Sequence, residues 1–556
     1  MRKNVHLVPA VAFLGTSVLM ILPQMMGRGV ILGSDSLFHF NRFYDTAMQI
    51  KNLNLQYFTS FYGFAQTGRI VNAFYGPLVA YFQGILVLLA GSWFNYQVLS
   101  NVILYLLSGC SMYVLLSKSK VRQSISVPLS ILYMMTFAIQ YWTLRQGFTS
   151  WGASLFPICL LPVNDMIQRK EVRSLPLGIL TALMVQTHML SSLFLVAIYV
   201  PCFLYAFFKS EEKGLLLRNL ALAIGIFLLL TMNLWVGMFE LYKGNTILAP
   251  FVNKTPELST IDWDSYYWLV TPGALLGILL FQFFYVVRYH KRVSFENKLL
   301  TTIACVFVLL SSSLIPWNRL VADGFILAEL VQFPFRFFVP ATVLFLFSFA
   351  LTLEEGNFKS LLTKICLWTI VIFSLAQDLV LVNLSVRDWQ KHGMAYVPGR
   401  ETFATHESES EIKAAFFTSD LSVALEYLQK PTPDYLPVYR KTNEDKYAEY
   451  KKVLLRNNLF TKTVDKDKLI VEWQAEKVRP TEVPVIKYAN TELTLNGKTL
   501  SEKECNLSNL GVVNVPSVQG KNRLTLRYNS PKGFNVLLLA TLGMWGISLF
   551  LLVKRR

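Results

Sequence analysis

Charged residues are scarce in this sequence of 556 residues. They make up 16% of it, whereas a typical soluble protein has roughly 25%. The deficit falls in long apolar runs, which are interrupted by short basic clusters. A single soluble core cannot absorb so many runs of this length. The sequence therefore excludes an ordinary soluble protein and indicates a chain that crosses a lipid bilayer.

Cysteine is also scarce, and the six cysteines show neither metal-site nor disulfide spacing. Most lie in apolar runs, and only Cys505 falls in the polar C-terminal segment, which therefore cannot form an internal disulfide. A small-x-small cleavage site is missing after the first apolar run, so this run is no obvious cleaved signal.

The net charge is +17. In a soluble protein this excess would suggest nucleic-acid binding, but here many basic residues sit in short loops between apolar runs. The positive-inside rule explains that placement more directly. We expect no nucleic-acid partner, and a smaller part of the charge is available to anionic lipid or phosphate.

Apolar runs of spanning length predict about thirteen transmembrane helices. They are expected at Leu7–Met26, Tyr75–Gly91, Val98–Leu116, Ser124–Tyr141, Trp151–Met166, Leu175–Met189, Leu190–Phe208, Leu215–Phe239, Trp268–Val287, Leu299–Ile315, Phe337–Leu353, Ile365–Leu384 and Phe534–Val553.

Basic connections give the expected orientation, because Lys and Arg favour the cytoplasmic side. From Arg169 onward the helices alternate consistently and the segment Val386–Lys532 falls outside. One conflict remains, because Lys118–Arg122 would lie outside if every earlier run crossed. Either an apolar stretch around Leu53–Gly91 crosses the membrane differently from the expected spans, or the Lys118–Arg122 loop breaks the positive-inside rule. The connections placed in the cytoplasm are Lys118–Arg122, Arg169–Arg173, Lys209–Arg218, Arg288–Lys298, Glu354–Lys364 and the tail Lys554–Arg556.

Three parts follow from this pattern: a polytopic membrane domain (1–385), an extracytoplasmic domain (386–532), and a last transmembrane helix with a basic tail (533–556). From about residue 468 the extracytoplasmic part reads as short strands, and Asn496-Gly497 is a strong hairpin signal. We predict a small antiparallel β-sandwich before the last helix. The expected strands are Lys468–Trp473, Val485–Tyr488, Glu492–Leu495, Gly511–Val515 and Arg523–Tyr528.

The loop after the first helix carries the most informative polar residues. Asp35, His39 and Arg42 have the spacing i, i+4 and i+7, which places them along one face of a helix at the outer membrane surface. The carboxylate could take a proton or hold a metal ion, the imidazole could share either task, and the guanidinium could bind phosphate. The alternative is a capped interfacial helix whose polar face meets water.

Further candidates lie at other outer helix ends. Arg319 and Arg336, in Trp317-Asn-Arg and Gln332-Phe-Pro-Phe-Arg, could bind a lipid phosphate or simply snorkel to the headgroups. Arg145 is another possible phosphate partner. His188 lies in a predicted outer hairpin, where a lone histidine is more often a hydrogen-bonded structural residue.

These motifs resemble large bacterial membrane proteins of the YfhO type. More narrowly, the sequence resembles the family named "6-pyruvoyl-tetrahydropterin synthase related, membrane protein". The resemblance covers nearly the whole chain, but each motif is short, and no pterin-synthase histidine triad is present. It rests on the Gly33-x-Asp-x-x-x-His-x-x-Arg42 loop, Phe74-Tyr-Gly-Pro77, Thr187-His188, Gln332-Phe-Pro-Phe-Arg336, Asp434-Tyr-Leu-Pro437 and the late β-domain.

Those families resemble the GT-C glycosyltransferases, which take a sugar from a polyprenyl-phosphate donor at the outer face. The resemblance implies a GT-C-like fold, with Asp35 as catalytic base or metal ligand and His39 beside it. It implies donor contacts from basic residues, here Arg42 and Arg336, to which His188, Arg145 and Arg319 are added as candidates. No cofactor is identified, although a divalent cation is possible. The first loop has a single Asp where many such enzymes carry an acidic pair, and the Tyr141–Trp151 loop lacks an acidic residue after Arg145.

Three hypotheses follow. The first is a multi-pass cell-membrane glycosyltransferase that uses a polyprenyl-phosphate-linked sugar to modify a cell-envelope polymer or lipid. The second is a non-catalytic envelope assembly or lipid-binding protein on the same scaffold. The third is a transporter, for which few buried charges and no paired broken helices are found.

Overall fold

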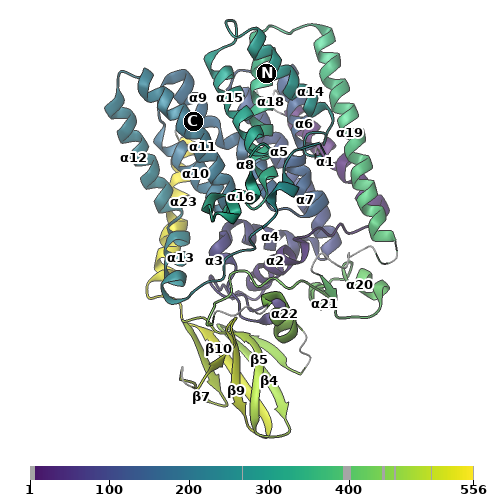
Figure 1. Cartoon of the computed structure of the whole chain (residues 1–556), viewed down its shortest axis with the longest axis vertical. Coiled ribbons are helices and arrows are strands. Elements are labelled where there is room, and N and C mark those ends of the chain that lie inside the picture. The colour runs from purple at the N-terminus through teal and green to yellow at the C-terminus, as the bar shows by residue number, and fades with distance from the viewer. Residues whose placement is uncertain are drawn as a thin grey trace.

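The computed structural model describes residues 7–263, 265, 267–391, 393, 402–440, 445–455, 459–501 and 504–554. The protein is mostly helical, at 63%, and carries a β-sheet region near its C-terminus (Figure 1). The expectation of a polytopic membrane protein is confirmed, although the number of thirteen spans is not. In the described part, eight helices are long and apolar enough to cross a membrane: α1 (Leu7–Gly27), α5 (Trp93–Lys118), α6–α7 (Gln123–Arg145), α11 (Met189–Lys209), α12 (Lys213–Leu230), η5–α18 (Pro334–Glu355), α19 (Leu361–Gln390) and α23 (Phe534–Lys554).

Shorter apolar helices complete the bundle. Three expected runs are divided: Ser124–Tyr141 at Met135 and Thr136, Trp151–Met166 at Leu160, and Leu215–Phe239 at Thr231. The remaining helices are α2 (Ser36–Lys51), η2 (Phe64–Gln66), α3 (Asn72–Tyr75), α4 (Pro77–Ala90), α6 (Gln123–Met134), α7 (Phe137–Arg145), α8 (Thr149–Cys159), α9 (Leu161–Asn164), η3 (Asp165–Arg169), α10 (Ser174–Thr187), α13 (Met232–Gly244), η4 (Pro256–Ser259), α14 (Ala274–Arg288), α15 (Phe295–Leu310), α16 (Trp317–Ala322), α17 (Ile326–Val331), η5 (Pro334–Phe337), α18 (Phe338–Glu355), α20 (Glu409–Ala415), α21 (Leu421–Tyr427), α22 (Lys446–Tyr450) and η6 (Lys451–Leu455).

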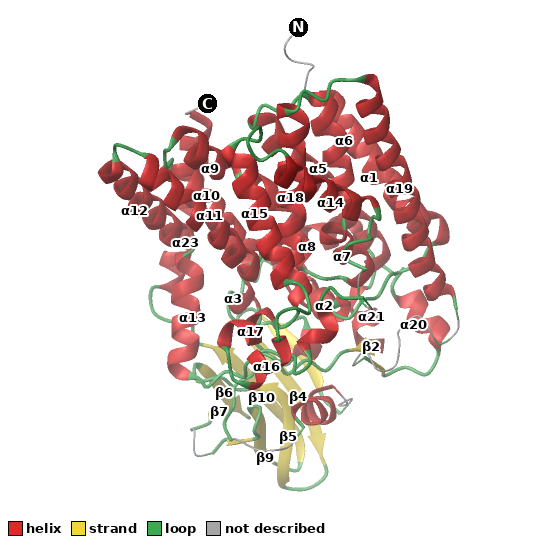
Figure 2. Ribbon diagram, turned by 45° about the horizontal axis from the view of Figure 1, so that its top comes forward, coloured by secondary structure: helices red, strands yellow, loops and turns green. Residues whose placement is uncertain are grey.

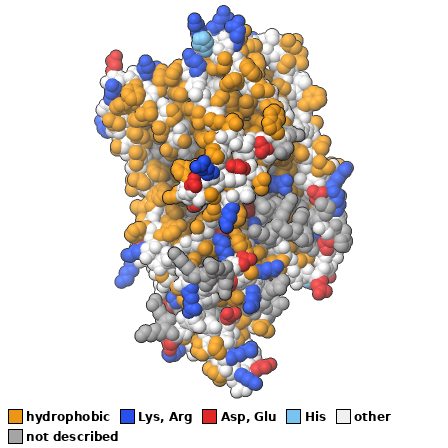
Figure 3. Space-filling view, viewed as in Figure 1, with side chains coloured by type: hydrophobic (Ala, Val, Ile, Leu, Met, Phe, Trp, Pro, Cys, Tyr) orange, Lys and Arg blue, Asp and Glu red, His pale blue; other side chains and the backbone are white. Residues whose placement is uncertain are grey.

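The basic connections lie together at one end of the bundle, and the β-sheet region lies at the opposite end (Figures 1 and 2). Arg122 forms an ion pair with Glu354 at 3.0 Å, which joins the Lys118–Arg122 and Glu354–Lys364 connections. The start of α1 and the end of α23 lie at this same end. Apolar side chains cover much of the flank between the two ends (Figure 3). The last two residues of the basic tail, 555 and 556, lie outside the described residues.

Helix α4 explains why the Lys118–Arg122 loop lies with the other basic loops. This helix has 14 residues and packs beside α2, between the bundle and the sheets (Figure 1). The Thr46 hydroxyl donates to the Ala80 carbonyl at 2.8 Å, and a Cβ at Gly84 would meet the Thr46 hydroxyl at 2.6 Å. The expected span Tyr75–Gly91 is shortened to these 14 residues, which are not among the eight helices long enough to cross a membrane. Because α4 lies between the bundle and the sheets, α1 and α5 are the long helices that precede the Lys118–Arg122 loop, which therefore lies at the same end as the start of α1.

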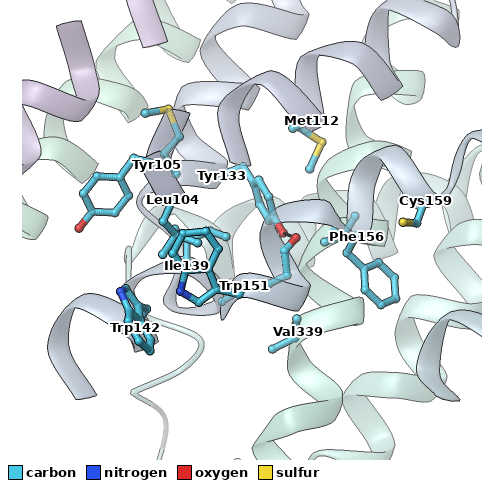
Figure 4. Close-up of a cluster of buried hydrophobic side chains, with 14 of the residues drawn as sticks. Leu104, Tyr105, Met112, Tyr133, Ile139, Trp142, Trp151, Phe156, Cys159 and Val339 are labelled. Carbon is cyan, nitrogen blue, oxygen red and sulfur yellow. Dashed lines mark hydrogen bonds between the residues drawn. The ribbon is translucent and has the colours of Figure 1, made fainter. Parts of the chain in front are cut away.

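A dense aromatic and aliphatic core joins α5, α6, α7, α8 and α18 (Figure 4). The rings of Trp142 and Trp151 meet edge to face at 6.1 Å, and the Tyr133 hydroxyl donates to the Ala153 carbonyl at 2.6 Å. These side chains are fully buried or nearly so. The packing fixes the end of α7, which carries Arg145, relative to the start of α8.

The C-terminal unit, residues 403–528, ends in a β-sandwich, as the period-2 pattern predicted. Asn496 and Gly497, with φ of 49° and 86°, form the two-residue turn of the hairpin that pairs Leu495 with Lys498. The expected strand Val485–Tyr488 is displaced, because the observed strand is Arg479–Ile486. One antiparallel sheet has the order β3-β4-β10-β6-β7 and packs against a second, β5-β9-β8. The strands are β3 (Thr461–Asp465), β4 (Lys468–Ala475), β5 (Arg479–Ile486), β6 (Thr491–Leu495), β7 (Lys498–Thr499), β8 (Asn506–Leu507), β9 (Val512–Ser517) and β10 (Gly520–Tyr528), beside the separate pair β1 (Phe403–Ala404) and β2 (Leu428–Gln429).

The last helix, α23, packs against α10, α12 and α13. The Trp545 indole donates to the Leu230 carbonyl at 2.9 Å, at the break between α12 and α13. The Gln186 amide donates to the same carbonyl at 3.2 Å. Three segments far apart in the sequence therefore meet at this break.

Candidate functional site

A cavity of ≈ 1290 Å³ lies where the bundle meets the C-terminal unit. Its walls come from α2, α3, α7, the α10–α13 group, α17 and the segment Lys430–Tyr435. Five residues proposed from the sequence line it: Asp35, His39, Arg145, His188 and Arg336. Residues from four separate helix ends thus converge on one cavity.

Asp35 stands at the start of α2, but its side chain does not cap that helix in the described structure. Instead its carboxylate forms an ion pair with Lys430, with the Nζ and Oδ1 atoms 3.3 Å apart. The Asp35 side chain is 47% exposed, so part of the carboxylate faces the cavity. The loop before it is fixed by the Ser36 hydroxyl, which accepts from the Gly33 amide at 2.7 Å.

His39 lies in an aromatic cage. Its ring stacks on Phe148 at 5.0 Å and on Phe43 at 5.7 Å, and its Nδ1 atom has no hydrogen-bond partner among the described residues. Burial lowers the pKa of His39 to about 3, although the nearby Asp35 opposes the shift. The imidazole is therefore neutral near pH 7, so it can exchange a hydrogen bond with a substrate but does not pair with phosphate as a cation.

His188 ends α10 and begins α11. Its Nδ1 atom accepts from the Ser191 backbone amide at 3.2 Å. Because a backbone N–H can only donate, Nδ1 carries no proton, and the proton of the neutral ring is on Nε2. Burial lowers the pKa of His188 to about 3, and Arg336 and Arg42 lower it further. The histidine is both a helix cap, as the structural interpretation predicted, and part of the cavity wall.

Arg336 is held at the cavity wall by its own loop. Its guanidinium donates to the Val331 carbonyl and to the Gln332 side chain, both at 2.9 Å, and it lies over the Phe333 ring. The Nε atom is buried without a partner in the described structure. Arg145, at the end of α7, is exposed and lines the same cavity. Two guanidinium groups are thus available to an anion at this end.

Arg42 and Arg319 do not line the cavity. Arg42 is fully buried three residues, just under one turn, after His39, and it donates to the Asn72 side chain at 2.7 Å and to the Gly76 carbonyl at 2.8 Å. The spacing predicted one helix face for Asp35, His39 and Arg42, but Arg42 does not reach the cavity, because this residue instead ties α2 to the turn before α4. Arg319 is 82% exposed and pairs weakly with Asp323, at 3.7 Å.

Sequence reasoning missed the segment Lys430–Tyr435, which the C-terminal unit contributes to the cavity. The buried Arg69 guanidinium fixes this segment by donating to the carbonyls of Thr432 and Asp434, at 2.7 and 2.6 Å. Tyr435 stacks on Phe74 at 5.1 Å and has a φ of 66°. In the sequence, only the motif Asp-Tyr-Leu-Pro drew attention to this segment. Nothing in the sequence indicated that the segment contacts the start of α2.

The β-sandwich also supports the cavity from below. The Lys462 ammonium of β3 donates to the Ala65 carbonyl at 2.8 Å. Phe64, Ala65 and Gln66 all have positive φ, of 55°, 53° and 51°, a conformation that costs free energy unless its surroundings hold it. Phe64 packs against Phe38, which lines the cavity. The sandwich therefore helps to shape the site although it contributes no strand residue to the wall.

The rest of the cavity is apolar and follows α11 from Met189 to Leu204, a stretch that rises about 22 Å. The facing wall comes from α10 and α12. Several of these side chains are 44–50% exposed, among them Leu193, Val196, Val200 and Ile224. The cavity thus joins a charged end to an apolar groove that is open along the bundle.

Metal binding by Asp35 gains no support from neighbouring ligands. Among the described residues, no group of three or more His, Cys, Asp or Glu side chains is placed to hold a metal ion. The charged neighbour of Asp35 is Lys430, which a divalent cation would have to displace. Two further carboxylates line the cavity, Glu329 and Asp434, and burial raises the pKa of Asp434.

No protein-family model matches this sequence, and no curated protein matches it. The family resemblance therefore rests on the short motifs alone, and the function has to be argued from the cavity.

Proposed function

We propose that this protein is a membrane glycosyltransferase of the GT-C type, which uses a polyprenyl-phosphate-linked sugar to modify a cell-envelope polymer or lipid. One observation carries the proposal: a single cavity joins Asp35 and two arginines to an apolar groove of about 22 Å. A lipid with a phosphate headgroup matches both parts. Its anionic head would meet Arg145 and Arg336, and its chain would lie along α11.

The proposed orientation places the site on the outer face of the cell membrane. The connections rich in Lys and Arg share one end of the bundle, and such loops favour the cytoplasm. The cavity and the β-sandwich, at the opposite end, would then be extracytoplasmic. A lipid-linked sugar on the outer leaflet would reach the groove from the side of α11 and α12.

In the proposed reaction, an acceptor hydroxyl attacks the anomeric carbon of the donor sugar. The Asp35 carboxylate accepts the hydroxyl proton, the new C–O bond forms, and the bond between the anomeric carbon and the phosphate oxygen breaks. The electron pair leaves with polyprenyl phosphate, whose charge Arg145 and Arg336 stabilise. The proton then passes from Asp35 to water. Attack opposite the leaving group inverts the anomeric configuration.

A second candidate is a protein that binds a lipid phosphate without turnover. The ion pair between Asp35 and Lys430 favours it, because a paired carboxylate is a weaker base than a free one. A transporter of polar solutes is less well supported. The groove beyond Thr181 is lined mainly by apolar side chains, which suit a lipid chain better than a hydrated solute.

The test is a transfer assay with the purified protein in lipid nanodiscs. Polyprenyl-phosphate-linked hexoses are supplied with a cell-envelope acceptor fraction, and released polyprenyl phosphate is measured. We expect turnover by the wild type, a loss of about 10²–10⁴-fold in Asp35→Asn, and full turnover in the control Asp323→Asn. Full turnover in Asp35→Asn would remove the catalytic role. Donor binding without turnover by the wild type would favour the second candidate.

A further inference from the structure

Lys430 is the cation nearest to the proposed base, and it comes from the C-terminal unit. It follows β2 directly, and its Nζ atom lies 3.3 Å from Asp35 Oδ1, across 395 residues of sequence. The same ammonium donates to the Ser34 carbonyl. The Lys430 side chain is only 10% exposed, so the charge is held inside the cavity wall.

We propose that Lys430 is an exchangeable phosphate-binding residue. It pairs with Asp35 when no donor is present, and it transfers its charge to the donor phosphate when the lipid binds. The exchange leaves Asp35 free to accept the acceptor proton. This inference rests on the proposed function, because it gives Lys430 a role in binding the same lipid phosphate.

The balance of charge in the cavity supports an exchange. Among the described residues, three cations line it, Arg145, Arg336 and Lys430, together with three carboxylates, Asp35, Glu329 and Asp434. A phosphate that approaches Arg145 and Arg336 also approaches Asp35, and the two negative groups repel each other. A cation that can reach both the phosphate and the Asp35 carboxylate reduces this repulsion. Lys430 already contacts Asp35, and its flexible four-carbon stem allows the ammonium to turn toward the phosphate.

The backbone around Lys430 is fixed, so the exchange requires movement of the side chain only. Arg69 holds the carbonyls of Thr432 and Asp434. The Tyr488 hydroxyl of the C-terminal unit donates to the Tyr435 carbonyl at 3.1 Å. On the other side, β2 is paired with β1. Anchored in this way, Lys430 stays within reach of the cavity throughout.

A binding experiment with the full-length protein in neutral-lipid nanodiscs tests the exchange. The probes are a polyprenyl phosphate without sugar and the matching uncharged polyprenol. We expect the wild type to prefer the phosphate. Lys430→Met should bind the phosphate at least tenfold more weakly and the polyprenol equally well, whereas Lys430→Arg should keep most of the preference.

Asp35→Asn gives the sharper prediction. Removing the carboxylate frees Lys430 and abolishes the repulsion, so this variant should bind the phosphate several-fold more tightly than the wild type. The double variant Asp35→Asn/Lys430→Met should lose that gain. Lys521→Met, which changes an exposed lysine of β10, serves as the control and should match the wild type.

The outcomes separate the two proposals. If the wild type fails to distinguish polyprenyl phosphate from polyprenol, both the proposed function and the exchange are wrong. If the wild type prefers the phosphate but Lys430→Met does so equally, only the exchange is overturned. Weaker phosphate binding by Asp35→Asn would also overturn it, because the ion pair would then support the site rather than compete with the ligand.

Discussion

Gly33 lies directly against the end of α7, so that a Cβ atom at Gly33 would fall 1.9 Å from the carbonyl oxygen of Arg145. This contact holds the loop that carries Asp35 beside a guanidinium of the cavity. Any side chain at position 33 would have to push the two segments apart, because the obstructing atoms are backbone.

Gly33→Ala should therefore lower both stability and transfer. We expect a loss of about 1–3 kcal/mol in the free energy of unfolding, as for other overpacked sites. The measurements are thermal unfolding in detergent and the nanodisc transfer assay. Gly225→Ala is the matched control, since a Cβ there meets nothing within 4 Å. Equal stability of the two variants would contradict the close contact.

Arg336 and Arg319 looked equivalent in sequence, but the structure separates them. Arg336→Ala should raise the KM for the lipid-linked donor about tenfold or more, because charge-assisted contacts to phosphate are among the stronger hydrogen bonds. Arg319→Ala should leave KM unchanged, since its side chain is 82% exposed and lies outside the cavity. Donor titrations of the two variants side by side provide the measurement. An equal effect of both changes would favour a general surface charge over a defined site.

The buried His39 should make stability depend on pH. Its pKa is about 3 in the folded protein and near 6.5 when exposed. Between these values the unfolded chain binds a proton that the folded chain does not, so stability falls as the pH drops from about 6.5 toward 3. His39→Phe keeps a ring in the cage and removes this contribution. The melting temperature of the variant relative to the wild type should rise between pH 7 and pH 4.5. A difference that stays constant with pH would show that His39 is not buried as a neutral ring.

The orientation can be tested with proteases and with thiol reagents. Protease added to spheroplasts should cleave within the C-terminal unit. A cysteine placed at Lys118, the exposed last residue of α5 beside the Arg122 loop, should react only after the membrane is permeabilised. In intact cells or spheroplasts, the sandwich should thus be accessible from outside, whereas the loop should be protected. Labelling of intact cells at position 118 would contradict the arrangement in which α4 does not cross.

Local sequence signals predicted the elements well. Long apolar runs gave the spanning helices, and Asn496-Gly497 gave the hairpin turn, because each depends on a few neighbouring residues. The position of α4 was not predictable in this way. One face of this helix packs against α2, whereas Leu78, Phe82, Ile85 and Leu89 are exposed. Composition alone does not distinguish such a short helix beside the bundle from one that spans it.

The site was predicted in part. Asp35 and His39 lie near the start of α2 and reach the cavity, but Arg42 is about 10 Å further along the helix than Asp35 and is covered by Tyr75 and Phe148. The spacing i, i+4, i+7 predicts which residues share a helix face. It does not predict how far along that face the helix is exposed to the cavity before other side chains cover it. The Lys430 contact depends on the folded chain and has no local signal.

The position of α23 has a consequence for how the protein is made. The carbonyl of Leu230, in the break beside the groove, is held by a tryptophan from this last helix. On the ribosome, α12 and α13 emerge some three hundred residues before their partner does, and the sandwich has to be folded in between. The groove therefore reaches its final shape only after α23 has been made, so a chain that terminates before this helix would sit in the membrane with an unfinished groove.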